Sequence, residues 1–373
     1  MKKVLLLWGY GTVGSVVARD LMESGFFVGI AWRNSKKIEE LRNTIGKVQS
    51  ESHILDFKSE ELLITAIQDY DVVLNCVEYT FNQMVLQACI KAKKHYIDLW
   101  DYYEWILKSR SYDSKLKDTG IVGILGAWSS PGIINVMIAH ISKNKEKVGE
   151  VIVSFADIVR QSDETMLPFN FQTVVEEITG DALAFENGKY NFLPGATKSI
   201  PVDFGPEFWK ADCYVTNHDE QYSLPIFFKE KGIKNCYFVM NHSPLYLKLI
   251  PPMKRIWFFS EEKIRVWENE VSPLEFVNTF MKRFLPTEFQ SDDKEILFAK
   301  VDDITVWVIN NSVNGIPAGI MNTWIGASLI AQYLANNDIK PWIHHPEDCI
   351  DSTWMISELK KRDFVIQVNW ISI

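Results

Sequence analysis

The chain has 373 residues, enough for two domains, and its 47% hydrophobic and 23% charged residues are the balance of a folded globular protein. A formal net charge of −9, with no basic cluster to offset it, excludes a surface that follows nucleic-acid phosphates. Five widely spaced cysteines without a C-x-x-C pair indicate a reducing cytoplasm, and no apolar run has the length of a membrane span. We therefore expect a soluble, cytoplasmic protein that binds a small molecule, with no nucleic-acid and no membrane partner.

The first residues of the chain have the pattern of a strand, a tight turn and a helix. Val4 to Trp8 is a short apolar run, and apolar residues recur at helical spacing from Val13 to Leu21. Between them lies a G-x-G-x-x-G motif, whose glycines permit the turn, let backbone amides approach a pyrophosphate and let helix and strand pack closely. The alternative is a plain glycine turn in another α/β protein. We assign dinucleotide binding to the residues of this motif: Gly9, Tyr10, Gly11, Thr12, Val13 and Gly14.

A second apolar run, Phe26 to Trp32, ends in Arg33 and Asn34. NAD-binding folds usually have an acidic residue at this point for the ribose 2′-hydroxyl, whereas the 2′-phosphate of NADP favours a cation. The sequence therefore predicts that Arg33 and Asn34 bind NADP, with NAD as the alternative cofactor. An ordinary basic loop that opens the next helix would explain the same residues.

Further apolar runs alternate with helical spans, which is the pattern of successive βαβ units and of a parallel sheet. Residues that follow the strands of such a sheet lie at its ligand-binding edge. We assign Asp56, Cys76 and Val77 to the cofactor site for this reason, although Cys76 is also explained as a small core residue. The strands expected after the second one are Val48 to Leu55, Asp71 to Val77, His95 to Leu99 and Gly120 to Gly126.

The pattern changes at residues 127–132, where two serines, a proline and a glycine interrupt the apolar runs. Longer strands then alternate with irregular loops, which is typical of an α+β domain. We predict an α/β fold: a Rossmann-type, doubly wound parallel sheet in residues 1–127 and 322–373, with an inserted α+β domain of mixed or antiparallel sheet in residues 128–321. The elements expected after the boundary include strands Glu150 to Ile158, Asn235 to Asn241, Lys254 to Phe259 and Ile304 to Ile309, helix Val271 to Phe284, and a last strand, Phe364 to Trp370, in the first domain.

Polar and aromatic residues just after the fourth to sixth strands are candidates for substrate and proton transfer. Asp98 suits a proton acceptor or a partner for a substrate ammonium, and the alternative is a helix cap. In the second domain, His218 and Glu220 suit a proton-transfer pair, and the alternative is an exposed loop. His344 and His345 lack a third ligand at suitable spacing, so we expect no metal. The residues assigned to substrate are Tyr79, Trp100, Trp128 and Ser130.

With these residues in view, the chain resembles the saccharopine dehydrogenase and reductase superfamily, in its lysine 6-dehydrogenase-like or carboxynorspermidine dehydrogenase-like branch. The resemblance rests on the order of several segments rather than on one motif. It implies a Rossmann domain with an inserted catalytic and dimerisation domain, and hydride transfer at a carbon that bears an amine. The segments are the glycine motif, Asp71 to Cys76, His95 to Leu99, Pro131 to Asn135, Asn217 to Glu220 and the tail around Pro346-Glu347.

Two departures from the saccharopine reductase branch point to a substrate other than saccharopine: Leu99-Trp100 stands in place of Ser-Tyr, and Ser130 in place of the aspartate of Asp-Pro-Gly. The sequence thus predicts an NADP-preferring, saccharopine dehydrogenase-like oxidoreductase that acts on a C–N bond of an amino acid or amino-acid adduct. A catalytically silent nucleotide-binding sensor or scaffold is the alternative. Surplus apolar segments in the second domain, such as Ile256 to Phe259, indicate a homodimer.

Overall fold

The computed structural model describes residues 1–7, 12–45, 50–55, 59–77, 79–99, 103–157, 171–205, 208–284, 293–369 and 371–373. The chain forms two compact units, one of residues 1–144 and 319–365 and the other of residues 145–318 and 366–373. These bounds differ from the expected ones at two places. The helix after the Ser-Pro-Gly segment belongs to the first unit, and the last residues belong to the second.

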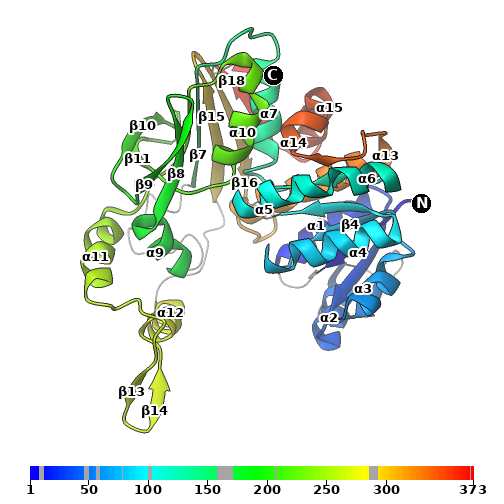
Figure 1. The fold of residues 1–373 in the computed structure, drawn as a ribbon, viewed down its shortest axis with the longest axis horizontal. Coiled ribbons are helices and arrows are strands. Elements are labelled where there is room, and N and C mark those ends of the chain that lie inside the picture. Colours follow the sequence, from blue (N-terminus) through cyan, green and yellow to red (C-terminus); the bar gives the residue numbers. More distant parts are fainter. Residues whose placement is uncertain are drawn as a thin grey trace. The chain divides into compact units, whose positions relative to one another are not determined.

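The first unit is built on a sheet of seven strands in the order β17-β6-β5-β4-β1-β2-β3 (Figure 1). Neighbouring strands pair in parallel, for example Leu5 with Gly29 and Leu6 with Leu74. The order reverses between β1 and β4, as in a doubly wound Rossmann sheet, which confirms the predicted fold class. The strands are β1 (Lys3–Leu7), β2 (Phe27–Trp32), β3 (Ser50–Ile54), β4 (Val72–Asn75), β5 (His95–Asp98), β6 (Gly123–Ile124) and β17 (Ile343–His344).

Helices between the strands cover this sheet and bury its apolar runs, as expected for a parallel sheet. Ser59 caps its helix by accepting a hydrogen bond from the Leu62 N–H at 3.4 Å. The helices and turns of this unit are α1 (Thr12–Glu23), α2 (Ser35–Ile45), α3 (Glu60–Ile67), η1 (Tyr79–Phe81), α4 (Asn82–Ala92), α5 (Tyr103–Ser109), η2 (Arg110–Tyr112), α6 (Asp113–Thr119), α7 (Ile133–Ser142), α13 (Ala318–Asn336), α14 (Pro346–Cys349) and α15 (Ser352–Lys360).

A buried carboxylate explains why the chain returns to the first unit after residue 318. Asp20 on α1 accepts hydrogen bonds from Ser328 Oγ at 2.6 Å and Gln332 Nε2 at 2.8 Å, both on α13. The guanidinium of Arg362 binds both of its oxygens, at 2.6 and 3.1 Å. This bidentate pair has the strong, directional geometry of Arg and carboxylate, and it ties the returning segment to the first helix.

The second unit is built on a mixed sheet of ten strands, β10-β11-β12-β7-β15-β16-β18-β19, with β8 beside β12 and β9 beside β8. β7 and β12 pair in parallel, while β15 pairs antiparallel with both β7 and β16. The mixed sheet confirms the expected α+β character. Its strands are β7 (Glu150–Asp157), β8 (Asp181–Glu186), β9 (Lys189–Pro194), β10 (Ser199–Asp203), β11 (Lys210–Val215), β12 (Asn235–Met240), β15 (Lys294–Val301), β16 (Ile304–Asn311), β18 (Val365–Val368) and β19 (Ile371–Ser372).

Two strand predictions in this region were wrong. Residues 254–259, expected as a strand, are the end of helix α11 (Pro244–Arg255) and a turn in which Trp257 has a φ of 57°. The last strand, β18, lies beside β16 in the second sheet and not in the first. The unit's other elements are α9 (Phe171–Thr179), α10 (Glu220–Phe227), η3 (Lys229–Lys231), α12 (Pro273–Phe284) and the hairpin of β13 (Ile264–Val266) and β14 (Asn269–Val271).

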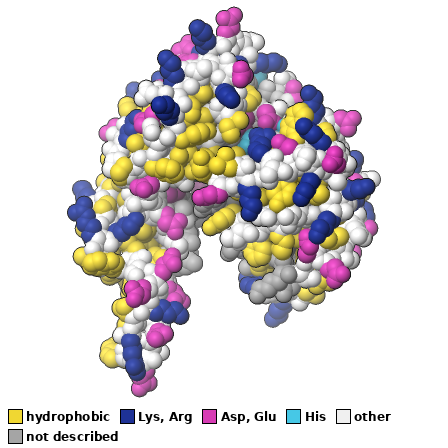
Figure 2. Space-filling model, viewed as in Figure 1, with side chains coloured by type: hydrophobic (Ala, Val, Ile, Leu, Met, Phe, Trp, Pro, Cys, Tyr) yellow, Lys and Arg dark blue, Asp and Glu magenta, His cyan; other side chains and the backbone are white. Residues whose placement is uncertain are grey.

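The described helices contain none that is both long enough and apolar enough to span a bilayer. On the face that Figure 2 shows, acidic and basic side chains are interspersed over both units.

Candidate active site

The strand β1, which precedes the predicted dinucleotide motif in the chain, lies at the point where the order of the parallel strands reverses. Ligands of doubly wound sheets bind at this point, beyond the carboxyl ends of the strands. Gly9, Tyr10 and Gly11 lie outside the described residues. Thr12, Val13 and Gly14 begin α1, the helix that follows β1 in the chain. The start of this helix fits a bound pyrophosphate.

Arg33 and Asn34 follow β2 at the same edge of the sheet, and both are exposed. The guanidinium carbon of Arg33 lies 5.4 Å from the centre of the Trp32 ring, a distance typical of a cation–π contact. Asn34 Oδ1 accepts a hydrogen bond from the Lys37 N–H at 3.2 Å, so this side chain caps α2. An exposed guanidinium at the end of the second strand fits a ribose 2′-phosphate.

The other predicted cofactor residues lie next to the reversal point or outside the described residues. Asp56 lies outside the described residues, and so does Trp100, which was assigned to substrate. The Cys76 N–H donates to the Leu7 carbonyl at 3.1 Å and so continues the pairing of β4 with β1. Burial raises the pKa of the Cys76 thiol well above its usual range, and Val77 is buried. Both residues thus stand at the end of β4, where a cofactor would pass.

Asp98 ends β5 and is fully buried. Its Oδ2 accepts hydrogen bonds from the Tyr96 hydroxyl at 2.9 Å and from Trp105 Nε1 at 2.8 Å. Its Oδ1 accepts from the Gly126 N–H at 3.1 Å. The carboxylate therefore ties β5 to α5 and to the loop after β6. This structural role differs from the helix cap considered as the alternative, and the proton-transfer role of Asp98 stays a prediction.

Trp128 and Ser130 lie in a tightly folded loop after β6. The Trp128 N–H donates to the Pro131 carbonyl at 2.8 Å, and the Trp128 carbonyl accepts from the Ile133 N–H at 3.1 Å. A Cβ at Gly326 on α13 would lie 2.2 Å from that same carbonyl oxygen, so only glycine permits this approach. Ser130 is 8% exposed, whereas Tyr79, at η1, is 46% exposed. The assignment of these residues to substrate stays a prediction.

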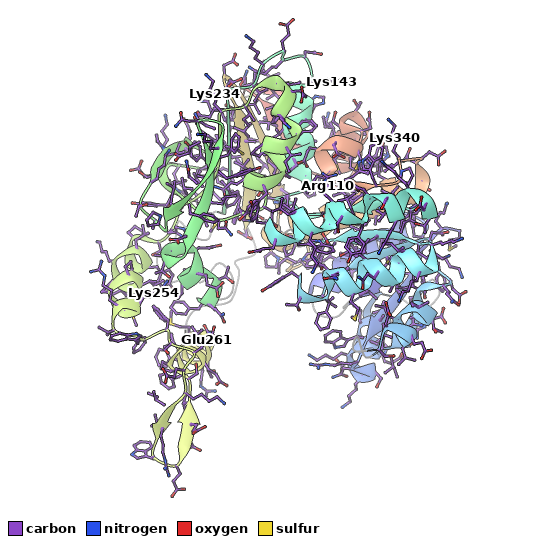
Figure 3. The ribbon with its side chains drawn as sticks, in the orientation of Figure 1. Arg110, Lys143, Lys234, Lys254, Glu261 and Lys340 are labelled. Atoms are coloured by element: carbon purple, nitrogen blue, oxygen red, sulfur yellow. The ribbon has the colours of Figure 1, made fainter. Side chains whose placement is uncertain are left out.

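A buried polar cluster that the sequence reasoning missed lies where α7 begins. Asn135 Nδ2 donates to Glu347 Oε2 at 3.1 Å, and Asn135 Oδ1 accepts from the Gly132 N–H at 3.3 Å. His345 follows β17 and is 3% exposed; burial lowers its pKa despite the charges of Glu347 and nearby acids. Arg110, labelled in Figure 3, binds the Ile343 carbonyl at 2.5 Å. His345 is thus a buried imidazole at the carboxyl edge of the sheet, where burial favours its neutral form.

His344, Asp348 and Cys349 have potential ligand atoms within 4.8 Å of one another, and they form the one such group among the described residues. Hydrogen bonds within the protein account for the closeness of His344 and Asp348. His344 Nδ1 lies 2.6 Å from Asp348 Oδ1, and its Nε2 lies 2.9 Å from the Lys340 carbonyl oxygen. Burial and nearby carboxylates raise the pKa of the Cys349 thiol well above its usual range, which disfavours the thiolate that a metal requires.

The second unit brings the side chains of His218 and Glu220 into contact. Their role as a proton-transfer pair stays a prediction. His218 lies in the loop between β11 and α10, and its Nδ1 is hydrogen-bonded to Glu220 Oε2 at the start of α10. The imidazole stacks on the Phe238 ring, with centres 3.8 Å apart and planes 12° apart. The His218 N–H donates to Gln221 Oε1 at 3.0 Å. His218 is therefore held by stacking of its ring on Phe238, by the hydrogen bond at Nδ1 and by the hydrogen bond of its backbone N–H.

The surroundings of the pair raise the pKa of His218. The side chain of Glu220 is fully buried, and that of His218 is 25% exposed. Burial lowers the pKa of His218, but the charge of Glu220 and the hydrogen bond to it outweigh burial and raise the pKa to about 9, with smaller contributions from Asp219 and Glu177. Among the described residues, none binds His218 Nε2. The imidazolium thus has one N–H held by a carboxylate and the other available to a ligand.

The ends of β11 and β12 carry further polar residues beside this pair. Thr216 Oγ1 lies 3.3 Å from His242 Nε2, and both side chains are buried. Asn217 Oδ1 accepts from the Leu183 N–H at 3.3 Å and from the Tyr222 hydroxyl at 3.2 Å. His242, just after β12, was missed because the sequence gives no sign that β12 ends beside β11.

Comparisons with known proteins agree with this arrangement. Residues 5–124 match the family model described as saccharopine dehydrogenase NADP binding domain. The carboxynorspermidine synthase of Vibrio alginolyticus is 25% identical over 294 residues, which are 72% of this chain and 69% of that protein. The corresponding protein of Vibrio cholerae is 25% identical over 74% of this chain and 72% of its own length. A carboxyaminopropylagmatine dehydrogenase of Synechocystis is 22% identical over 75% of this chain and 72% of its own.

The solved structure of saccharopine dehydrogenase (L-Glu forming) from Saccharomyces cerevisiae matches 100% of both chains, with a TM-score of 0.75 and 14% identity. At this identity the match shows a shared fold. The alternative of a catalytically silent sensor gains no support, since the relatives are named as a synthase or a dehydrogenase. Residues 5–124 therefore match the NADP-binding domain of the saccharopine dehydrogenase family, and the whole chain shares the fold of the yeast enzyme.

Proposed function

We propose that this protein is an NADP-preferring oxidoreductase that reduces the C=N bond of an imine to the C–N bond of a carboxylated amine. The observation that carries the proposal is the His218–Glu220 pair, an imidazolium held by a buried carboxylate. Carboxynorspermidine and carboxyaminopropylagmatine, which appear in the relatives' names, are amines that carry a carboxyl group. An imidazolium that is protonated at neutral pH suits the carboxylate of such a ligand.

The cofactor part of the proposal rests on the reversal point of the sheet and on Arg33. We propose that the glycine motif holds the pyrophosphate and that the Arg33 guanidinium binds the 2′-phosphate, helped by its exposed position after β2. Cys76 and Val77 would line the path of the cofactor at the end of β4, and Asp56 the adenine end. NADPH, when bound, supplies a hydride. NAD remains the alternative to be tested.

Residues of the chain itself would donate the proton and stabilise the charge of the proton donor. With a pKa of about 9, His218 is protonated at neutral pH, so its Nε2–H can donate a proton to the substrate nitrogen while that nitrogen's carbon receives a hydride. The same N–H can instead bind a substrate carboxylate. The charge of Glu220 and its hydrogen bond to Nδ1 stabilise the imidazolium before transfer. In the reverse direction, amine oxidation requires neutral His218 and should therefore increase as the pH approaches 9.

Asp98 keeps its proposed part in proton transfer or ammonium binding, with Tyr79, Trp100, Trp128 and Ser130 as the proposed substrate contacts. The three hydrogen bonds of Asp98 mean that any test must separate a loss of stability from a loss of turnover.

The experiment is steady-state kinetics of His218→Gln, with His140→Gln as the control that loses a histidine elsewhere. Amines and amino acids such as lysine, ornithine and polyamine precursors are paired with oxo acids or aldehydes, and NADPH absorbance is followed. We expect His218→Gln to lose about a hundredfold or more in kcat, the usual scale for a positioned acid, with unchanged affinity for NADPH. A raised KM with normal kcat would assign His218 to carboxylate binding. Normal kinetics in His218→Gln would refute the proposed site.

We further propose a homodimer in a reducing cytoplasm. The five cysteines form no disulfide, and three of them are buried, which supports the reducing compartment.

A further inference from the structure

A buried network of polar side chains lies at the carboxyl edge of the first sheet, and most of it has no part in the proposed reaction. β4 ends at Asn75 and β5 ends at Asp98, and these two residues are paired neighbours in the sheet. Both side chains are fully buried, whereas the residues before Asn75 in β4 are apolar. Polar side chains therefore gather where the two strands end, although polar groups are costly to bury unless they are hydrogen-bonded.

The side-chain amide of Asn75 connects three elements of the first unit. Its Nδ2 donates to Oδ1 of Asn82, the first residue of α4, at 2.8 Å. The same nitrogen donates to the Tyr96 hydroxyl at 3.5 Å, and Asn75 Oδ1 accepts from the Val77 N–H at 3.4 Å. An amide nitrogen has two N–H donors, and both have partners here. Asn75 thus fastens the segment after β4 to α4 and to β5.

Tyr96 connects this amide to the carboxylate of Asp98. The Tyr96 hydroxyl donates to Asp98 Oδ2 at 2.9 Å, and the ring is buried in the core of the first unit. Asp98 in turn holds the residues that follow β6. Its Oδ1 accepts from the Gly126 N–H at 3.1 Å, and its backbone carbonyl accepts from the Ala127 N–H at 2.9 Å.

The network therefore joins two loops that follow the strands on either side of β5, one after β4 and one after β6. The pairing of β4 with β5 ends at Asn75 and Asp98, so side chains and not the sheet hold the loops beyond this point. Apolar side chains here would bury area without the cost of desolvating polar groups. What a hydrogen-bonded network adds is one fixed geometry.

These two loops belong to the half of the sheet that would receive the nicotinamide. A dinucleotide lies across both halves of a doubly wound sheet. The glycine motif and Arg33 belong to the half with β1, β2 and β3, which suits the adenosine end, so β4, β5 and β6 are left for the nicotinamide end. Val77 follows β4, and the loop after β6 continues to Trp128 and Ser130, the proposed substrate contacts.

We propose that Asn75 and Tyr96 are positioning residues for the nicotinamide end of the cofactor. They hold the loop after β4 and the loop after β6 at one spacing, so that the nicotinamide ring and the substrate contacts on the second loop meet in a fixed arrangement. Neither side chain touches the cofactor. The inference rests on the proposed function, because it requires that NADPH binds at this edge of the sheet.

A network that served stability alone would respond differently to mutation. Its loss would lower the melting temperature and would leave the affinities of the folded protein unchanged, or would lower all of them equally. The two ends of the cofactor separate these cases. NADPH has both ends, whereas 2′,5′-ADP has the adenine, its ribose and the 2′-phosphate but no nicotinamide.

The first test is calorimetric titration of wild type, Asn75→Ala and Tyr96→Phe with NADPH and with 2′,5′-ADP. We expect Asn75→Ala to raise the Kd of NADPH about tenfold, the scale of one lost hydrogen bond, and to leave the Kd of 2′,5′-ADP unchanged. Tyr96→Phe keeps the buried ring and removes only the hydroxyl that joins Asn75 to Asp98. It should fold and show a loss in the same direction, so the test stands even if Asn75→Ala does not fold.

Two control variants interpret the result. Val85→Ala removes buried apolar atoms from α4, so it should lower the melting temperature and leave both affinities unchanged. Arg33→Ala should weaken both ligands, because both carry the 2′-phosphate. Wild type that binds neither ligand would refute the proposed function, and this inference with it. Unchanged NADPH affinity in Asn75→Ala and Tyr96→Phe, equal losses for both ligands, or a selective loss of NADPH in Val85→Ala would refute the inference alone.

The second test needs no cofactor. Hydrogen exchange of the ligand-free protein, read residue by residue by NMR, reports how firmly each loop is held. Asn75→Ala removes the acceptor of the Val77 N–H, and through Tyr96 it should also speed exchange of the Gly126 N–H on the other side of β5. Unchanged exchange at Gly126 in both Asn75→Ala and Tyr96→Phe would show that the two loops are held separately, and would overturn the proposal.

Discussion

The titration of His218 is the property that most sharply separates a tuned proton-transfer pair from an ordinary surface loop. Its pKa is raised from 6.5 to about 9, which corresponds to about 3 kcal/mol in favour of the protonated folded state. We discount this to about 2–3 kcal/mol because a quarter of the imidazole is exposed. Because the folded state holds the proton more tightly than the unfolded state, this stabilisation is complete below pH 6.5 and is lost as the pH rises through about 9.

Glu220→Gln removes the charge that opposes burial. Burial, which by itself lowers the pKa, then dominates, and the pKa of His218 should fall to or below its usual value. The loss of stability of the second unit between pH 6.5 and 9 should shrink accordingly. The assay is an NMR titration of the imidazole signals, with His218→Gln to assign the resonance. Hydrogen exchange at the amides of β12 reads the stability of the second unit separately from that of the first.

The reasoning would be refuted by a wild-type His218 that titrates near 6.5. It would also be refuted if Glu220→Gln kept the same pH dependence of stability, because the loss would then come from other groups.

Three further predictions concern the first unit. Arg33→Ala should weaken NADPH binding by about 1–3 kcal/mol and leave NADH binding nearly unchanged in fluorescence titrations; equal losses would make Arg33 structural. Asp98→Asn should lower the free energy of unfolding in urea by about 1–3 kcal/mol, because three donors face the carboxylate and an amide offers one oxygen; unchanged stability would contradict the hydrogen bonds described. Gly326→Ala should lower the melting temperature, although alanine normally stabilises a helix by up to about 1 kcal/mol, because its Cβ would lie 2.2 Å from the Trp128 carbonyl oxygen. A raised melting temperature would show that this contact relaxes freely.

The parallel sheet could be predicted because its strands are buried on both faces. Val4 to Leu7 have no exposed surface. A strand buried on both faces is a continuous apolar run, and such a run can be recognised in the sequence. The position of Arg33 after the second run followed directly. β17 has two residues, too few to show any period, so the sequence did not indicate that His345 follows a strand at the sheet's edge.

Elements whose identity depends on distant partners could not be predicted. Residues 254–259 are apolar enough for a strand, but the helix that begins at Pro244 runs through Pro251 and Pro252 to Arg255, against the usual effect of proline. The strand at Val365 was expected, but its sheet is decided by pairing with β16, which local sequence does not encode. For His218 and Glu220, spacing gave the pair, whereas the burial of Glu220 and the stacking on Phe238 arise from the packing of α10 on β12.

The central claim is tested most directly by following NADPH absorbance while the protein is supplied with an amine and a carbonyl compound that together form a carboxylated imine. The account predicts that NADPH is consumed in proportion to the secondary amine formed, that NADH is a poorer donor, and that His218→Gln slows the reaction about a hundredfold without changing NADPH affinity. Binding of NADPH without its consumption, for every pair of amines and oxo acids or aldehydes supplied, would contradict it.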